Sequence, residues 1–140
     1  MNRLEDKVAI ITGATGGIGE ATVDLFIKEG ANVLMVDLSE DELISVSNKI
    51  GSNKLSYFQG DVTNASDNQR AVELAIERYG GLDIFVANAG VSGDVSSITE
   101  YNEEVFDQVM SVNAKGPFLG LQAAIPFMTE RGGGSFVAIS

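Results

Sequence analysis

The chain has 140 residues, of which 44% are hydrophobic and 21% charged, and this composition is typical of one globular domain. Its net charge of −11 repels phosphate backbones and argues against a nucleic-acid partner. The sequence has no Cys and no His, which excludes disulfides, thiolate chemistry, a Ser-His-Asp triad and the commonest metal ligand. No apolar run reaches the roughly 18 residues of a membrane span, and no signal-peptide pattern opens the chain. We therefore expect a cytoplasmic protein without a metal site or a membrane partner.

The first pattern along the chain predicts a strand, a glycine turn and a helix. The apolar run Lys7–Thr12 predicts the strand, and an amphipathic pattern predicts the helix Gly17–Glu29. A helix N-terminus presents free N–H groups and the positive end of the helix dipole, which suit a pyrophosphate, and glycines let a cofactor approach the backbone. The spacing Gly13-x-x-x-Gly17-x-Gly19 differs from the general G-x-G-x-x-G form. A glycine-rich turn without a ligand is therefore the alternative.

The second predicted strand, Asn32–Asp37, ends in a carboxylate. Asp37 follows the last glycine of the turn by 18 residues, close to the roughly 20 expected of an acid that accepts hydrogen bonds from an adenosine ribose. The alternative is a solvated turn acid, because Ser39 and Glu42 form a capping-box pattern at the start of a predicted helix Glu40–Ile50. Since Ser39 already provides the cap, we favour the ribose role for Asp37.

Strand and helix patterns continue to alternate along the rest of the chain. A second capping box is predicted at Ser66–Gln69, and Gly116-Pro117 is expected to bend the last helix. This alternation predicts an α/β fold with a doubly wound parallel sheet of the Rossmann type, as one dinucleotide-binding domain over residues 1–140. The further predicted strands are Leu55–Gln59, Ile84–Ala87 and Ser135–Ile139, and the further helices are Asp67–Arg78 and Glu103 to about Arg131.

Four motifs together resemble the short-chain dehydrogenase/reductase family in its classical form. They are Thr12–Gly19, Asp61-Val62, Asn88-Ala89-Gly90 and Asn113, in the order and with spacings similar to those of the family. The resemblance covers the chain from about residue 7 to residue 140. One departure is Ala87, where the family often has a second Asn, and this change leaves the assignment standing.

The resemblance implies that the chain binds NAD(H). In such a protein Asp61 bonds the adenine amino group, and Val62 and Val112 contact the cofactor through their backbones. The alternative for Asp61 is a residue that only opens its turn, and Asn88 can brace the sheet as well as touch the cofactor. NADP is disfavoured because Asp37 would repel a 2′-phosphate. The expected cofactor contacts are Gly13, Thr15, Gly17, Ile18, Gly19, Asp37, Leu38, Asp61, Val62, Asn88, Ala89, Gly90 and Val112.

The resemblance also implies hydride transfer between the nicotinamide and a carbonyl or alcohol carbon of a small substrate. The family moves the proton with a Tyr-x-x-x-Lys pair, but Tyr57, Tyr79 and Tyr101 are not followed by Lys at that spacing. Asn113 is expected to shape a helix kink and to hold, by its carbonyl, a water near the catalytic Lys. Ser140 is the neighbour of the position at which the family has its catalytic Ser.

The sequence is therefore expected to be the cofactor-binding half of an NAD-dependent oxidoreductase, with a sheet that is incomplete at the C-terminus. Two alternatives stay open: a non-catalytic NAD-binding module, and a fragment whose main property is association. We expect the complete protein to be a homodimer or homotetramer, and the chain alone to be inactive and prone to associate. The helix expected to be left partly uncovered carries Phe118, Leu121, Ala124, Ile125 and Met128.

Overall fold

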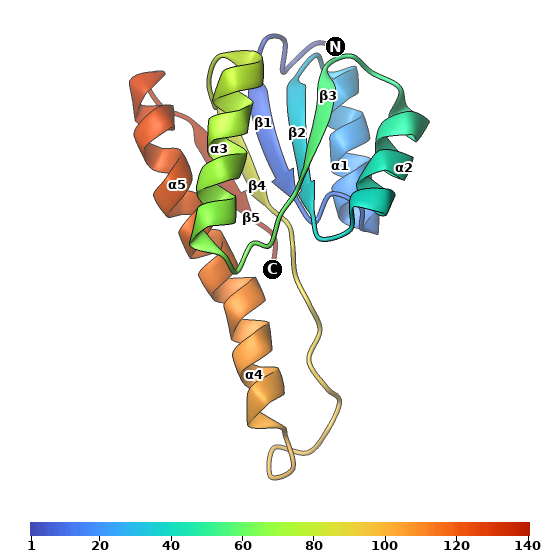
Figure 1. The fold of residues 1–140 in the computed structure, drawn as a ribbon, viewed down its shortest axis with the longest axis vertical. Helices are drawn as coiled ribbons and strands as arrows, with labels where there is room; N and C mark the ends of the chain where they lie inside the picture. Colours follow the sequence, from blue (N-terminus) through green and yellow to red (C-terminus); the bar gives the residue numbers. More distant parts are fainter.

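The computed structural model describes all 140 residues, which form a five-stranded sheet with helices on both of its faces (Figure 1). The strand order is β3-β2-β1-β4-β5, and every neighbouring pair is parallel, so the predicted doubly wound fold is confirmed. The strands are β1 (Val8–Thr12), β2 (Asn32–Asp37), β3 (Leu55–Gln59), β4 (Ile84–Ala87) and β5 (Ser135–Ala138). The helices are α1 (Gly17–Lys28), α2 (Glu40–Ile50), α3 (Ala65–Tyr79), α4 (Glu103–Met110) and α5 (Gly116–Glu130), with a π-helical turn, η1 (Ser111–Lys115), before α5.

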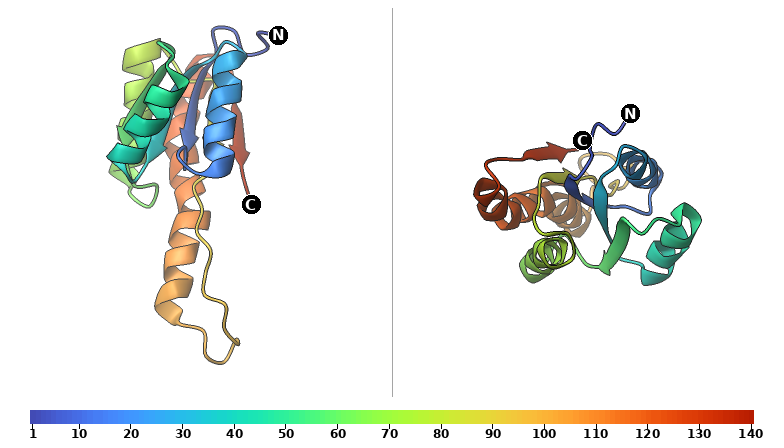
Figure 2. Two further views of the ribbon diagram at one scale, coloured as in Figure 1. Left: turned by 90° about the vertical axis from the view of Figure 1, so that its right-hand side faces the viewer. Right: turned by 90° about the horizontal axis from the view of Figure 1, so that it is seen from above.

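Two apolar cores lie on opposite faces of the sheet. Successive side chains of a strand point to opposite faces, so Ile10 and Phe85 pack under α3 and α5 while Ile11 and Met35 pack under α1 and α2. Figure 2 shows the sheet between these two pairs of helices. The strands read as continuous apolar runs because both faces are covered, as in other parallel sheets.

The chain changes direction in the sheet at β1. From β1 it proceeds through β2 to β3 with α1 and α2 on one face, and then it returns to β4 and β5, on the other side of β1, with α3 and α5 on the second face. Ligands of open α/β sheets bind outside the carboxyl ends of the strands at such a reversal of strand order. The fold therefore directs attention to the loops that follow β1 and β4.

Two helix starts differ in how they are capped. The Ser39 hydroxyl accepts a hydrogen bond from the N–H of Glu42 at 3.3 Å, as the sequence predicted. The capping box predicted at Ser66–Gln69 was wrong, because α3 begins at Ala65 and its cap is Asn64. The Asn64 side chain accepts from the Ser66 N–H at 3.0 Å, so the cap lies two residues earlier than expected.

The predicted long helix from Glu103 to Arg131 is divided into α4, η1 and α5. The irregular turn occupies Ser111–Lys115 and α5 begins at Gly116, so the irregularity lies directly before Gly116-Pro117. Pro117 lies in the first turn of α5, directly after the irregular turn. Figures 1 and 2 show α4 and the segment 88–102 extending beyond the sheet as an arm. No helix of the protein has both the length and the hydropathy that crossing a bilayer requires.

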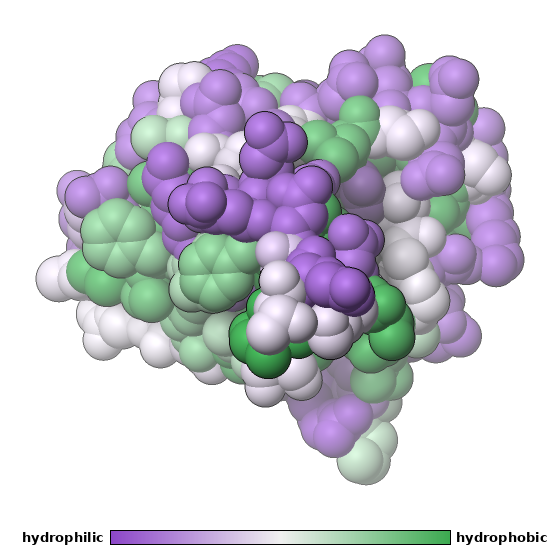
Figure 3. All heavy atoms as spheres, turned by 90° about the horizontal axis from the view of Figure 1, so that it is seen from below, coloured by the Kyte–Doolittle hydropathy of each residue, from purple (hydrophilic) through white to green (hydrophobic).

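The last helix, which was expected to be left partly uncovered, has one buried face and one exposed face. Ala124 and Met128 are buried against the sheet, because they lie on the face of α5 that packs over β4. Phe118 and Ile125, on the same helix, are 59% and 50% exposed. Seen from below, the molecule shows apolar side chains gathered beside a polar stretch (Figure 3).

Candidate functional site

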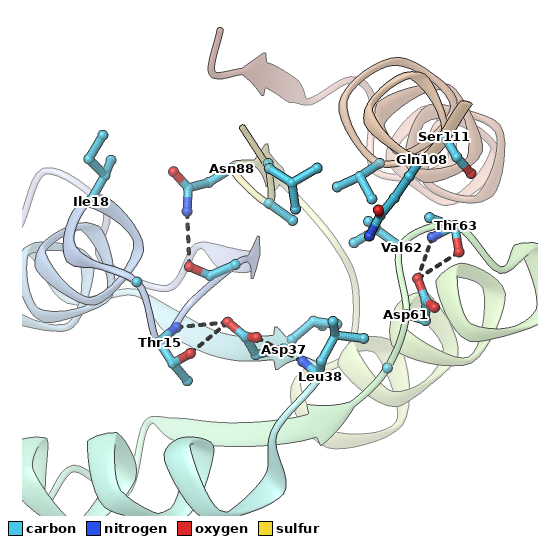
Figure 4. Close-up of a pocket in the computed structure, with 18 of the residues that line it drawn as sticks. Thr15, Ile18, Asp37, Leu38, Asp61, Val62, Thr63, Asn88, Gln108 and Ser111 are labelled. Atoms are coloured by element: carbon cyan, nitrogen blue, oxygen red, sulfur yellow. Dashed lines mark hydrogen bonds between the residues drawn. The ribbon is translucent and has the colours of Figure 1, made fainter. Parts of the chain in front are cut away.

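A cavity of about 780 Å³ opens at the carboxyl ends of the strands (Figure 4). Its volume lies within the range of about 300–1,000 Å³ that is usual for small-molecule sites. Loops after all of β1–β4 form its walls, and the end of α4 with the start of η1 closes one side. The wall contains residues 13, 15–18, 36–38, 60–63, 88–91, 108, 111 and 112, and none of them is Lys or Arg.

Twelve of the thirteen cofactor contacts predicted from the sequence line this one cavity. The exception is Gly19, which is buried behind the turn and does not line the cavity. A Cβ at Gly19 would lie 2.9 Å from the Ala14 Cα, closer than packed side chains come. Gly19 therefore allows α1 to pack against the turn, and its expected cofactor contact stays a prediction.

The other glycines of the turn have two different functions. Gly13 has a φ of +61°, and a Cβ there would lie 2.7 Å from the Ala89 Cα, so only glycine fits between the β1 and β4 loops. A Cβ at Gly17 would meet no protein atom within 4 Å, although Gly17 lines the cavity. Helix α1 begins at Gly17, and no side chain caps it. Its first N–H groups thus stay available to an anionic ligand, and the backbone leaves room for one.

Asp37 is fixed at the end of β2, facing the glycine turn. Its Oδ2 accepts hydrogen bonds from the backbone N–H and the hydroxyl of Thr15, at 3.0 and 2.8 Å, and its Oδ1 accepts from the Leu38 N–H at 2.8 Å. The side chain is half-buried, so it differs from the solvated turn acid that was the alternative. It presents an oriented carboxylate to the cavity (Figure 4).

Asp61 opens its turn, which is the structural interpretation, and it also lines the cavity, which the cofactor interpretation requires. Its Oδ1 accepts from the N–H and the hydroxyl of Thr63, at 2.9 and 2.7 Å. Its Oδ2 accepts no hydrogen bond from the protein, and so one acceptor remains for a ligand. Both interpretations of Asp61 are therefore compatible with the geometry.

Asn88 braces the sheet at the floor of the cavity. Its amide donates to the backbone oxygens of Thr12 and Gly13, at 3.1 and 3.0 Å. In return the buried Thr12 hydroxyl accepts from the N–H groups of Asn88 and Ala89, both at 3.1 Å. These bonds fix the loop after β4 against the loop after β1, and Asn88 remains on the cavity wall.

Asn113 and Ser140, the two residues linked to catalysis by the resemblance, lie off the cavity wall. Asn113 belongs to η1, so the helix irregularity expected there is present. Its side chain is exposed, and it binds the backbone of Val91, which lies 22 positions away in sequence. Ser140 is exposed and lies beyond the end of β5.

Sequence reasoning missed several residues of the wall. Gln108 and Ser111 contribute from α4 and η1, and Figure 4 shows Gln108 beside Val62. Gln108 precedes Val112 by four residues, so the helical period could have placed both on one face. The other missed residues are Gly16, Val36, Gly60, Thr63 and Val91, all adjacent in sequence to predicted ones.

Comparisons with known proteins agree with this geometry. Short-chain dehydrogenase reductase 3a of Arabidopsis thaliana is 40% identical over 130 residues, which are 93% of this chain and 51% of the plant protein. Zerumbone synthase of Zingiber zerumbet is 40% identical over 140 residues, which are 99% of this chain and 52% of that protein. The chain thus spans about half the length of the curated relatives it matches.

Solved structures give the same result. A 3-ketoacyl-(acyl-carrier-protein) reductase from Brucella melitensis, complexed with NADH, is similar with a TM-score of 0.88 at 35% identity, over 92% of this chain and 53% of that one. Levodione reductase is similar with a TM-score of 0.92 at 31% identity, over 97% of this chain and 54% of that one. The sequence model described as short chain dehydrogenase matches residues 7–140. Because this match takes in every segment that lines the cavity, we conclude that the chain belongs to the short-chain dehydrogenase family.

Proposed function

We propose that the chain is the dinucleotide-binding part of an oxidoreductase that transfers hydride between NAD(H) and the carbonyl or alcohol carbon of a small substrate. One observation carries this proposal: the uncapped N-terminus of α1 and the oriented carboxylate of Asp37 face one cavity. The first suits a pyrophosphate and the second a ribose diol. The nicotinamide would supply the hydride chemistry, while the protein supplies binding and orientation.

Each wall of the cavity has a proposed task toward the cofactor. The N–H groups at the start of α1 hold the pyrophosphate, and Asp37 accepts the ribose hydroxyls. The unused Oδ2 of Asp61 accepts from the adenine amino group, and the small residues Ala89 and Gly90 leave room for the ribose and ring at the nicotinamide end. Ile18, Leu38, Val62 and Val112 provide the apolar contacts of the wall.

We propose a preference for NAD(H) over NADP(H). Asp37 carries a negative charge where a 2′-phosphate would lie, and no Lys or Arg lines the cavity to balance it. Relatives and neighbours support a nicotinamide cofactor, since one neighbouring structure contains NADH. The choice between the two cofactors is inferred from the charges of this chain alone.

The residues linked to proton transfer keep the status of predictions. None of the three tyrosines lines the cavity. We therefore assign cofactor binding to this chain, and we do not assign the proton-transfer role to any of its tyrosines. The water-holding carbonyl of Asn113 and the position of Ser140 beside a substrate-binding Ser are inferred from the family resemblance. Assembly into a homodimer or homotetramer and a cytoplasmic location are predictions of the same kind. The exposed Phe118 and Ile125 support self-association.

A binding titration tests the proposal. NADH fluorescence, followed while the full chain is added, should saturate, and ADP-ribose should compete because it carries the pyrophosphate and the ribose. No saturable binding would contradict the proposal. An assay of NADH consumption with a panel of carbonyl compounds then separates an enzyme from a non-catalytic NAD-binding module, and we expect this chain alone to bind without turnover.

A further inference from the structure

Glu42 in α2 reaches the cofactor cavity through Thr15. Its Oε2 lies 3.0 Å from the Thr15 hydroxyl, and the two residues are 27 positions apart in sequence. In a complete capping box Glu42 would instead return to the N–H of Ser39. Only the first half of that box forms, since Ser39 accepts from the Glu42 N–H but its own N–H does not donate to Glu42. The carboxylate is thus directed to the cavity rim rather than to its own helix.

Two carboxylates share one hydroxyl at this rim. The Thr15 hydroxyl lies 2.8 Å from Asp37 Oδ2 and 3.0 Å from Glu42 Oε2. A hydroxyl has one proton, so it donates to only one of these oxygens at a time. When ribose hydroxyls donate to Asp37, Thr15 can turn its proton to Glu42, while the Thr15 backbone N–H stays on Asp37 at 3.0 Å. Glu42 therefore offers the displaced hydroxyl an alternative acceptor.

We infer that Glu42 is a second specificity-determining residue at the adenosine ribose, and this inference rests on the proposed function. Held by Thr15, its charge adds to that of Asp37 where a 2′-phosphate would approach, and the wall has no Lys or Arg to offset the two. The two carboxylate oxygens lie 2.8 and 3.0 Å from the same hydroxyl and are thus closer together than a Debye length of about 8 Å, so screening reduces their combined repulsion without removing it. A ribose without a phosphate meets no such penalty.

The test compares the dissociation constants of NADPH and NADH on the full chain. In Glu42→Gln the ratio Kd(NADPH)/Kd(NADH) should fall on the order of fivefold, the scale of one partly screened charge interaction near a surface. Asp41→Asn is the matched control, because it removes the same charge from the same helical turn, and Asp41 makes no hydrogen bond to Thr15. Its ratio should not change. High salt should reduce the Glu42→Gln effect.

A second pair of variants separates local placement from bulk charge. Thr15→Val removes the hydroxyl that holds Glu42, so in that background Glu42→Gln should change the ratio by less than it does in the original chain. Glu42→Ala, which suits a helix, repeats the measurement if Glu42→Gln folds poorly. Equal changes in Glu42→Gln and Asp41→Asn would overturn the inference, as would an unchanged ratio in Glu42→Gln. If the unmodified chain binds neither cofactor, the proposed function itself fails.

Discussion

Asn113 binds both backbone groups of Val91. Its Oδ1 accepts from the Val91 N–H at 2.8 Å, and its Nδ2 donates to the Val91 carbonyl at 2.9 Å. The pair connects η1 to the loop after β4 across 22 positions of sequence. Because Val91 lines the cavity, these two hydrogen bonds, called the Asn113 clamp below, fix one wall of the site to the helix that follows α4.

Removing the hydrogen bonds between Asn113 and Val91 should loosen the cavity wall at Val91. In Asn113→Ala both hydrogen bonds are lost, each worth about 1 kcal/mol, so exchange of the Val91 amide proton should quicken roughly thirtyfold. Asn113→Asp keeps the acceptor for the N–H but turns an oxygen toward the Val91 carbonyl, and it should give an intermediate result. Amide hydrogen exchange measured by NMR checks both. Unchanged exchange at Val91 in Asn113→Ala would show that the clamp is not formed in solution.

The same substitution tests the role inferred from the family. In a complete dehydrogenase that contains this chain, Asn113→Ala should reduce kcat far more than it raises the dissociation constant of NADH. Loss of a proton path typically costs about 10²–10⁴-fold in rate. Steady-state kinetics together with an NADH titration provide the comparison. A variant with full turnover would contradict the relay assignment and leave Asn113 with the clamp alone.

Asp37 should decide the choice of cofactor. Two like charges about 4 Å apart near a protein surface repel by on the order of 4 kcal/mol before screening, so NADH should bind more tightly than NADPH. Asp37→Ala should weaken the binding of NADH, because its ribose loses a hydrogen-bond acceptor. The difference between the dissociation constants of NADH and NADPH should then become smaller. Competition titrations with both cofactors measure this. Equal or tighter binding of NADPH by the unmodified chain would sink the prediction.

Two glycines of the turn should respond in opposite ways. Gly17→Val adds a side chain that meets no protein within 4 Å of its Cβ, so the fold should persist while NADH binding is blocked. Gly19→Ala forces a Cβ to 2.9 Å from the Ala14 Cα and should lower the free energy of unfolding by about 1–3 kcal/mol. Thermal melts followed by circular dichroism, paired with NADH titrations, distinguish the two. A Gly17→Val chain that binds NADH normally would show that the turn has no ligand role.

Glu29 should make stability sensitive to acid. The side-chain hydrogen bond from Arg3, at 2.9 Å, lowers the pKa of Glu29 from 4.5 to about 2, helped by the Arg3 backbone N–H at 3.0 Å. A carboxylate with a lowered pKa stabilises the fold above its unfolded value, and this contribution is lost as the pH falls from about 4.5 through about 2. Glu29→Gln removes that component, so its stability should change less across this window. Denaturant unfolding at several pH values checks it, and parallel curves for both chains would refute it.

Much of the fold could be predicted because its signals are local. Apolar runs with turn residues at their ends placed all five strands, and Asp37 at the end of β2 followed from its distance to the glycine turn. The start of α3 was misplaced because Asn64 and Ser66 are both good caps, and the path of the preceding loop decides which of them meets the free N–H groups. Local patterns thus predict which elements form more reliably than where they begin.

Sequence alone determined the parallel α/β fold, the glycine turn and the twelve predicted residues that meet in one cavity. Tertiary structure decided the rest: that Asn113 holds Val91, that Glu42 turns to Thr15, and that Gly19 serves packing. The physical reason is the range of the interactions. Strand and helix formation depends on neighbours within a few residues, whereas a hydrogen bond between elements exists only after packing has set their separation to within about an ångström.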